Sequence, residues 1–157
     1  MKILLLTIGN TDKAYIREGI DDYIKRLYYY IPFETKVIPD LKNRSTLSVE
    51  LQKEKEGQMI LNQVVTGDIL ILLDERGTEF SSVEFSKWME KKMIAGTRQL
   101  VFVIGGPYGF SKSVYERSDF KISLSQLTFS HQMVRMIFVE QLYRAMTIIK
   151  NEPYHHE

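Results

Sequence analysis

The stretch VFVIGGPYGF, residues 101–110, decides the fold class of this chain. An apolar run typical of a buried strand breaks at Gly105 and Gly106, and residues 111–113, SKS, look like the first turn of a helix after Gly109. A strand that runs into a glycine loop and then into a helix often holds a ligand, because glycines allow close backbone approach and expose N–H groups. The same glycines would equally serve a tight strand-to-helix turn without a ligand. The stretch therefore predicts an α/β unit and leaves both interpretations of its loop open.

Apolar runs and helical patterns alternate along the whole chain, and this alternation predicts an α/β fold with a mostly parallel sheet and helices on both faces. In such a sheet, ligands bind beyond the carboxyl ends of the strands. Three loops follow strands in the C-terminal half, at residues 74–77, 105–109 and 125–131, so the site is expected there. The expected strands are residues 3–8, 33–38, 69–73, 100–104 and 120–125, and the expected helices are residues 12–30, 48–65, 81–96, 111–117 and 133–150.

Length and composition exclude several classes of protein. With 157 residues the chain fits one domain, residues 1–157. The absence of cysteine excludes a disulfide scaffold, a cysteine-ligated zinc and a thiol nucleophile. The N-terminal segment MKILLLTIGN is too short for the apolar core of a signal peptide, and no apolar run reaches the length of a membrane span. We therefore expect a cytoplasmic protein with no membrane or metal partner, whose net charge of +1 does not by itself announce a nucleic-acid partner.

The order of the motifs argues against two nucleotide-binding classes. Residues 106–113, GPYGFSKS, lack one glycine of the phosphate-binding P-loop because Ser111 stands in its place. The acidic strand that ends at Asp74 also precedes this loop, whereas the corresponding strand of P-loop enzymes follows it. A dinucleotide fold would carry its G-x-G-x-x-G pattern after the first strand, where this chain has only GNT, residues 9–11. The glycine loop therefore belongs to another class of site.

A set of motifs in a fixed order resembles one family over essentially the whole chain. The motifs are LLD with a following glycine (residues 72–77), VIGGPYG (103–109), SLSQLTFSHQMVR (123–135), EQLYRA (140–145) and PYHHE (153–157). Together they resemble the RlmH family, bacterial methyltransferases of the SPOUT superfamily that act on N3 of a pseudouridine in 23S ribosomal RNA. The resemblance implies a homodimer, S-adenosyl-L-methionine as cofactor, and 23S rRNA within the ribosome as partner. It also implies a C-terminal trefoil knot, contrary to the usual expectation of unknotted chains.

The resemblance also assigns a cofactor site. Leu124, Leu127 and Phe129 would offer an apolar wall for adenine while backbone groups read its edge. Without the resemblance, core packing would be the simpler account of these three side chains. Asp74 would face the sulfonium or the ribose, or cap the next turn. Carried over by position, the cofactor-binding residues are Leu73, Gly105, Leu124, Ser125, Gln126, Leu127, Thr128 and Phe129.

The candidate catalytic residues lie near the end of the chain. The imide nitrogen of pseudouridine carries a proton at neutral pH, so a group must accept that proton, and charge on the neighbouring carbonyls needs donors. We expect Arg144 to orient a phosphate or a base carbonyl, and Tyr154 and His155 to stack on the flipped base and handle its proton. Arg144 could instead be a salt-bridged helix residue and His155 part of a frayed tail. His131, the fourth candidate, fits a loop-fixing hydrogen bond better than a base.

The sequence predicts an oligomeric state but leaves more than one function open. The helix 133–150 carries more apolar side chains than one helix face needs, so we expect a homodimer through it. Two other functions fit the same residues: a SPOUT methyltransferase that acts on another RNA, and a non-catalytic RNA- or nucleotide-binding α/β module. Basic clusters that a dimer would double into an RNA-binding face are Lys42 with Arg44, Lys91 and Lys92 with Arg98, and Arg135 with Arg144 and Lys150.

Overall fold

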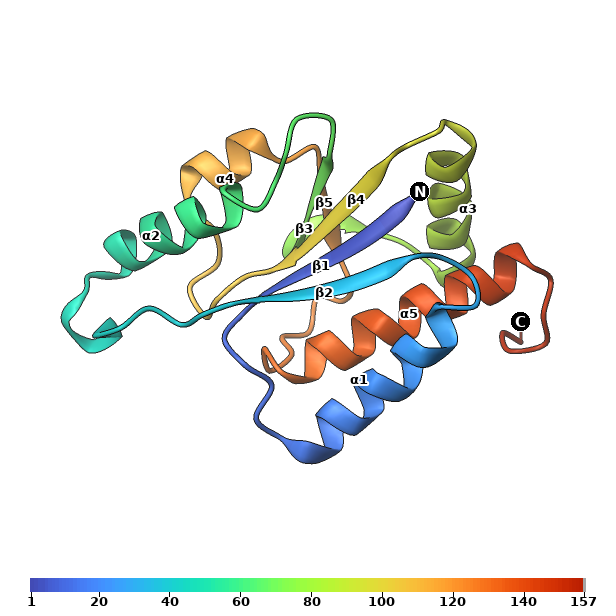
Figure 1. Ribbon diagram of the computed structural model, residues 1–157, viewed down its shortest axis with the longest axis horizontal. Coiled ribbons are helices and arrows are strands. Elements are labelled where there is room, and N and C mark those ends of the chain that lie inside the picture. The colour runs from blue at the N-terminus through green and yellow to red at the C-terminus, as the bar shows by residue number, and fades with distance from the viewer. Residues whose placement is uncertain (157) are drawn as a thin grey trace.

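One parallel sheet organises residues 1–156, the part of the chain that the computed structural model describes (Figure 1). Its five strands are β1 (Lys2–Ile8), β2 (Phe33–Ile38), β3 (Ile69–Glu79), β4 (Gln99–Ile104) and β5 (Phe120–Ser123). The strand order is β2-β1-β4-β3-β5, and every neighbouring pair is parallel. The parallel sheet that the alternating pattern predicts is confirmed, and all carboxyl ends therefore lie at one edge of it.

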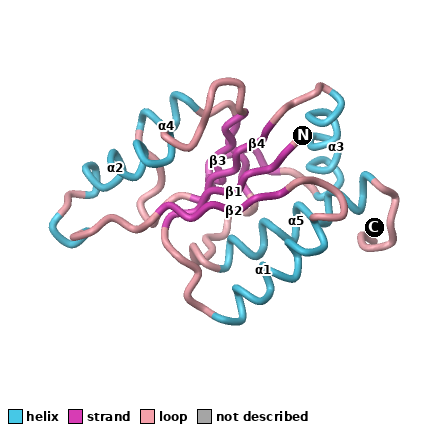
Figure 2. Tube along the Cα trace, viewed as in Figure 1, coloured by secondary structure: helices cyan, strands magenta, loops and turns pink. Residues whose placement is uncertain are grey.

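Helices cover both faces of the sheet, as Figure 2 shows. Successive side chains of a strand point to opposite faces. Leu5 accordingly lies in one core with Phe138, whereas Leu6 lies in the other core with Ile60. The two-faced arrangement predicted from the sequence is confirmed. The first core is covered by α1 (Ala14–Leu27), α3 (Ser82–Ile94) and α5 (Met133–Ile149), and the second by α2 (Val49–Leu61) and α4 (Lys112–Arg117).

The segment 74–77, which we expected to be a loop, lies inside β3, so this prediction is wrong. The strand continues to Glu79, but its pairing with β5 is interrupted: Leu73 and Thr78 are both partners of Ile122. The four residues between them form a bulge and are left out of the ladder with β5. A Cβ atom at Gly77 would lie 2.6 Å from the backbone of Ile122, so only glycine lets β5 come this close.

Other element boundaries differ from the predicted ones by a few residues. The helix α1 begins at Ala14 and ends at Leu27, and α2 ends at Leu61, four residues before the expected end. Turns follow both helices at their carboxyl ends. The strand β5 ends at Ser123 rather than at residue 125.

Two local sequence features bear on the helices: a capping pattern at the start of α3 and a glycine within α2. The S-x-x-E pattern predicts a capping box, and Ser81 and Glu84 form both of its hydrogen bonds at the start of α3. Glycine weakens an isolated helix, yet α2 runs through Gly57 without interruption. A Cβ atom there would lie 2.2 Å from the Ser111 hydroxyl oxygen and 3.1 Å from a methyl group of Val114. Gly57 is therefore the contact point at which α2 and α4 pack.

Helix α5 lies on the same face as α1 and α3 and supplies Phe138, Leu142 and Met146 to the core beneath it. None of the helices within residues 1–156 combines the length and the hydrophobicity that crossing a bilayer requires. The trefoil knot that the family resemblance implies stays a prediction.

Candidate functional site

A hollow of about 630 Å³ lies at the carboxyl end of β4, where its pairing with β3 stops and the bulge of β3 begins, and the sequence places the ligand site there. Its volume is within the range of small-molecule sites. Leu73 pairs with Ile104, so the next residues along each strand, Asp74 and Gly105, follow side by side at this edge. The hollow is lined by the bulge residues 73–76, the glycine loop 104–110, the loop 128–131, and Lys53, Tyr115 and Val134.

The glycines of the loop are required by their neighbours. A Cβ atom at Gly105 would lie 2.9 Å from the ring of Phe110, and one at Gly106 would lie 2.6 Å from the carboxyl group of Glu56. Gly109 has a φ of 77° and donates its N–H to the carbonyl of Gly106 at 3.2 Å. The tight turn and the ligand site that the sequence left as alternatives are thus compatible. The same loop makes the turn and lines the hollow.

The predicted cofactor residues divide into two groups. Leu73, Gly105, Thr128 and Phe129 line the hollow together. Leu124 lines a separate hollow of about 320 Å³ that it shares with Phe85 and Ile137. The side chain of Leu127 is 77% exposed, and Ser125 accepts its N–H at 2.9 Å. Of the three side chains expected to form an apolar wall, only Phe129 lines the large hollow, where the wall is completed by Leu73, Ile104 and Val134. Gln126, Ser125 and Leu127 are outside its described lining, and a backbone role for them stays a prediction.

His131 does not fix the loop that precedes α5. It is exposed at the rim of the hollow, while its neighbours hold the backbone. Ser130 accepts the N–H of Met133 at 3.2 Å. The side-chain oxygen of Gln132 accepts the N–H groups of Asp12 and Lys13 at 3.0 and 3.1 Å. Ser130 and Gln132, rather than His131, therefore supply the loop-fixing hydrogen bonds.

Tyr115 also lines the hollow, although it is not among the residues predicted from the sequence. This side chain comes from α4, and its hydroxyl group donates to the carboxylate of Asp74. Burial, together with that hydrogen bond, raises the pKa of Tyr115 to about 12, so it stays protonated at neutral pH. The signal that could have found it is its position in the first helix after the glycine loop, because this helix begins at the sheet edge where ligands bind.

The other three catalytic candidates lie together at the far end of α5. The guanidinium of Arg144 donates to Glu140 through Nε at 3.1 Å and to Nδ1 of His155 through Nη1 at 3.3 Å. The same group lies 4.8 Å from the centre of the Tyr154 ring. Tyr154 donates its hydroxyl to Glu140 at 3.1 Å and lies 3.3 Å from the hydroxyl of Tyr23. The salt bridge that we considered for Arg144 is present, and it belongs to this cluster rather than replacing it.

The surroundings of Tyr154 and His155 determine which of their side-chain atoms carry a proton. Burial and the hydrogen bond with Tyr23 raise the pKa of Tyr154 well above its ordinary value, so its hydroxyl stays protonated. A guanidinium can only donate, so Nδ1 of His155 accepts and the proton of the neutral ring is on Nε2. The cluster therefore offers hydrogen-bond donors, Arg144 and the Nε2–H of His155, beside the aromatic face of Tyr154.

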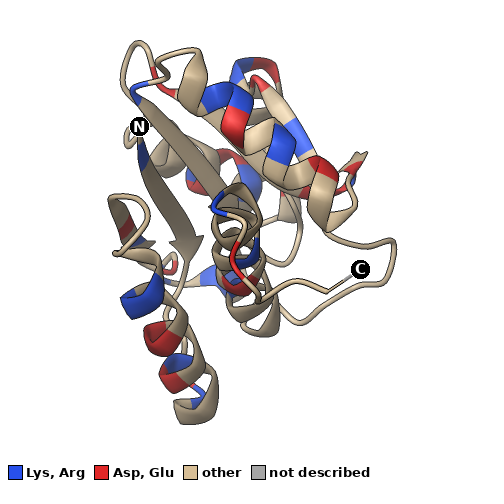
Figure 3. Cartoon of the chain, turned by 90° about the vertical axis from the view of Figure 1, so that its right-hand side faces the viewer, with Lys and Arg blue, Asp and Glu red and all other residues tan. Residues whose placement is uncertain are grey.

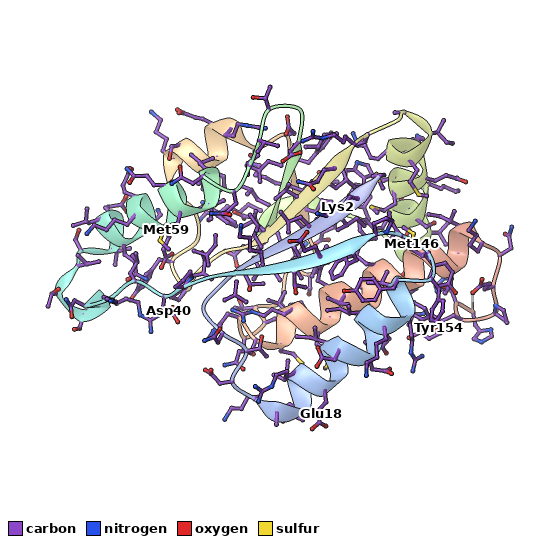
Figure 4. The ribbon with its side chains drawn as sticks, in the orientation of Figure 1. Lys2, Glu18, Asp40, Met59, Met146 and Tyr154 are labelled. Carbon is purple, nitrogen blue, oxygen red and sulfur yellow. The ribbon has the colours of Figure 1, made fainter. Side chains whose placement is uncertain are left out.

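The cluster and the hollow do not meet within one chain. Val134 lines the hollow, and Arg144 follows ten residues later on α5, which corresponds to about 15 Å along the helix axis. The tail is the segment that follows α5, of which the structure describes residues 151–156. Figure 1 shows it on the side of the molecule where β1 begins, away from the carboxyl ends of the strands. Figure 4 places Tyr154 there and Asp40, which follows β2, on the opposite side. A single chain thus holds the hollow and the cluster at opposite ends.

The arginines of the basic clusters expected from the sequence are paired with acidic residues or buried. Arg44 pairs with Asp40 at 2.8 Å, and Arg98 pairs with Asp68 at 3.3 Å. Arg135 is only 2% exposed and donates to the carbonyl of Ile8 at 2.6 Å, so it is a structural residue. Figure 3 shows basic and acidic residues interleaved along the helices. Arg135 therefore contributes nothing to a basic face, and a face that a dimer would build from the lysines of these clusters stays a prediction. No group of three or more acidic or histidine side chains within residues 1–156 is arranged to hold a metal ion.

Comparisons with known proteins identify the family of this chain. A family model described as "Predicted SPOUT methyltransferase" matches residues 1–155. Proteins called "Ribosomal RNA large subunit methyltransferase H" from Parabacteroides distasonis and Flavobacterium psychrophilum are 60% and 59% identical over 157 residues, and each match covers 100% of both chains. The structure of a probable methylase family protein from Haemophilus influenzae Rd KW20 has a TM-score of 0.52 at 11% identity, covering 99% of this chain and 70% of that one, which shows a shared fold. This chain belongs to the SPOUT methyltransferase family.

Proposed function

We propose that this protein transfers a methyl group from S-adenosylmethionine to N3 of a pseudouridine in 23S rRNA, as a homodimer in the cytoplasm. The observation that carries the proposal is the hollow at the carboxyl end of β4 and the bulge of β3, which unites Leu73, Gly105, Thr128 and Phe129 in a chain of a methyltransferase family. Relatives named as ribosomal RNA large subunit methyltransferases match over their full length and support the choice of substrate.

The residues of the hollow fit the methyl donor. Leu73, Ile104, Phe129 and Val134 are apolar and suit the adenine ring, while exposed backbone of the glycine loop suits its polar edge. Charged side chains of both signs, such as Asp74 and Lys53, also line the hollow and suit a zwitterionic methionyl group. When bound, S-adenosylmethionine would supply a methyl group on a positively charged sulfur, which is the electrophile of the reaction.

The second half-site would come from the partner chain. Because Arg144, Tyr154 and His155 lie at the far end of α5 from the hollow, a two-fold related copy is needed to bring such a cluster to it. Helix α5 has the surface for such a contact, since Met136, Ile137 and Ile148 are only half-buried in the single chain. In an isologous dimer each hollow would then receive the tail of the other subunit.

The cluster would act on the base as a set of donors. Arg144 and the Nε2–H of His155 can hydrogen-bond to carbonyl oxygens that gain negative charge when N3 loses its proton. The ring of Tyr154 offers a stacking face, and its protonated hydroxyl is not a base at neutral pH. His155 can accept a proton at Nδ1 only when its contact with Arg144 opens.

The test is transfer of a labelled methyl group. The protein is incubated with labelled S-adenosylmethionine and ribosomes that lack the modification, and the labelled nucleotide is then located. We expect label at N3 of one 23S pseudouridine. Label in a different RNA would favour a SPOUT methyltransferase with another substrate. Absence of both transfer and cofactor binding by the folded protein would contradict the proposal and favour a non-catalytic module.

A further inference from the structure

The bulge of β3 places one carboxylate in the hollow. The pairing of β3 with β5 stops after Leu73 and resumes at Thr78, so Asp74 is the first residue released from that ladder. Asp74 is half-buried and lines the hollow. It lies beside Gly105, because the residues before them, Leu73 and Ile104, are paired. This location separates Asp74 from Glu79, which is exposed further along the same strand and outside the lining.

Neutral donors hold this carboxylate in a fixed orientation. Its Oδ2 accepts the hydroxyl of Tyr115, and its Oδ1 accepts the backbone N–H of Arg76 at 2.8 Å. A carboxylate has about four acceptor positions, so two of them are left for a ligand. The hydroxyl of Tyr115 keeps its proton because its pKa is raised to about 12, and it therefore donates across the neutral pH range.

Asp74 forms no ion pair with a basic side chain within residues 1–156, whereas Lys53, another residue of the hollow, pairs with Glu50 at 3.6 Å. A half-buried negative charge with spare acceptor positions attracts a cationic ligand and repels an anionic one. A nucleotide phosphate would therefore be disfavoured at this position.

We propose that Asp74 is a specificity-determining residue that recognises the positive charge of the methyl donor, and that Tyr115 is the positioning residue that orients it. This inference rests on the proposed function and adds to it a reason for selectivity. S-adenosylmethionine carries positive charge on its sulfonium and on its ammonium group. A carboxylate in the hollow favours such a molecule over nucleotides of similar size that carry phosphates.

The proposal is tested by measuring binding to three ligands by calorimetry, with the wild-type protein and Asp74→Asn. The ligands are S-adenosylmethionine, its demethylated product, which keeps only the ammonium charge, and methylthioadenosine, which has neither charge. Asparagine keeps the shape but only one of the two acceptor oxygens, so one contact, with Tyr115 or with the N–H of Arg76, changes together with the charge, and methylthioadenosine reports the effect of that change alone. We expect Asp74→Asn to weaken the binding of S-adenosylmethionine roughly tenfold, as the loss of one charged hydrogen bond predicts. The binding of methylthioadenosine should weaken by less than about twofold.

The ligand series identifies the charge that is recognised. An effect on S-adenosylmethionine alone assigns Asp74 to the sulfonium, and an equal effect on the demethylated product assigns it to the ammonium group. Equal weakening of all three ligands, or of none, would overturn the proposal. If the wild-type protein binds none of the three, the proposed function fails instead.

Two further variants control for folding and for general charge. Glu79→Gln removes one negative charge from the same strand outside the hollow, and we expect it to leave the three affinities within about twofold of wild type. Tyr115→Phe removes only the hydroxyl that orients Asp74, and should weaken S-adenosylmethionine by a smaller factor than Asp74→Asn while sparing methylthioadenosine. A Tyr115→Phe protein that loses all three ligands equally would show a purely structural role. The melting temperature without ligand is measured for each variant.

Discussion

At the scale of single residues, the site depends on contacts between side chains that are distant in sequence. Tyr115 and Asp74 are 41 residues apart and meet only because α4 returns to the end of β3. Gly105 is required by the ring of Phe110 rather than by the hollow itself. A valine there would displace Phe110, which also lines the hollow, so we expect it to disturb the site indirectly.

The contact between Tyr115 and Asp74 predicts a pH dependence of stability. The pKa of Tyr115 is about 12 in the folded protein and 10.0 as its ordinary value, so the folded state favours the protonated phenol. Its contribution is fully present below pH 10.0 and is lost as the pH rises towards about 12. We expect the free energy of unfolding, measured by urea denaturation from pH 9 to pH 12 (roughly the alkaline range of tyrosine), to fall less steeply in Tyr115→Phe. Parallel curves for the two proteins would contradict this.

At the scale of secondary-structure elements, most of the fold is predictable from the sequence, because apolar runs and helical periodicity are local signals. The strands and helices were found at nearly the correct positions for this reason. The bulge at 74–77 was missed, since a break in pairing depends on where β5 lies and not on the sequence of β3. The candidate site is predictable as far as Leu73, the last residue of its predicted strand, and Gly105, which follows β4, whereas Leu124 and Leu127 are outside the large hollow.

The packing of α2 on α4 gives a prediction at this scale. Alanine is a better helix former than glycine by about 1 kcal/mol, so Gly57→Ala would stabilise an isolated α2. In the protein its Cβ atom would lie 2.2 Å from Oγ of Ser111, and we expect a net loss of about 1–3 kcal/mol in the free energy of unfolding. Ser111→Ala removes that oxygen.

The double variant Gly57→Ala/Ser111→Ala shows whether packing against Ser111 or helix propensity determines the effect of Gly57→Ala. In the Ser111→Ala background, we expect Gly57→Ala to cost far less than in the wild type, with a coupling free energy above about 1 kcal/mol in urea denaturation. Equal effects of Gly57→Ala in both backgrounds would show that the contact with Ser111 is not the cause.

At the scale of the whole molecule, the arrangement of α5 connects assembly with activity. Its first turns border the hollow and its last turns carry Arg144, so one helix separates the hollow from the cluster of Arg144, Tyr154 and His155. The tail that follows is packed rather than frayed: Tyr154 contacts Tyr23 and Tyr143, and Tyr30 donates to Glu152. These contacts order the tail on its own chain, at the end of the molecule far from its own hollow.

Removal of the tail tests this division. A protein that ends at Lys150 loses Tyr154 and His155 but no residue that lines the hollow. We expect it to stay folded and dimeric and to bind S-adenosylmethionine with unchanged affinity, while methyl transfer to ribosomes falls by a factor on the order of 100 or more. His155→Ala and Tyr154→Ala should each reproduce part of that loss. Full activity of the truncated protein would move the catalytic assignment to Arg144 and His131.

Mixed dimers then show which chain supplies the tail. Tail-less subunits have an intact hollow, and Gly105→Val subunits have an intact tail, so neither forms a complete site alone or with itself. If the tail serves the partner's hollow, a mixed dimer contains one complete site, and random mixing of equal amounts should restore roughly a quarter of wild-type transfer. If the tail serves its own hollow, every dimer in the mixture lacks a complete site and transfer stays at the level of the separate variants. The comparison requires that Gly105→Val is folded, which its melting temperature checks, because its Cβ atom displaces the ring of Phe110. The outcome depends only on whether an intact hollow receives an intact tail. It therefore distinguishes a site made by two chains from a site made by a single chain.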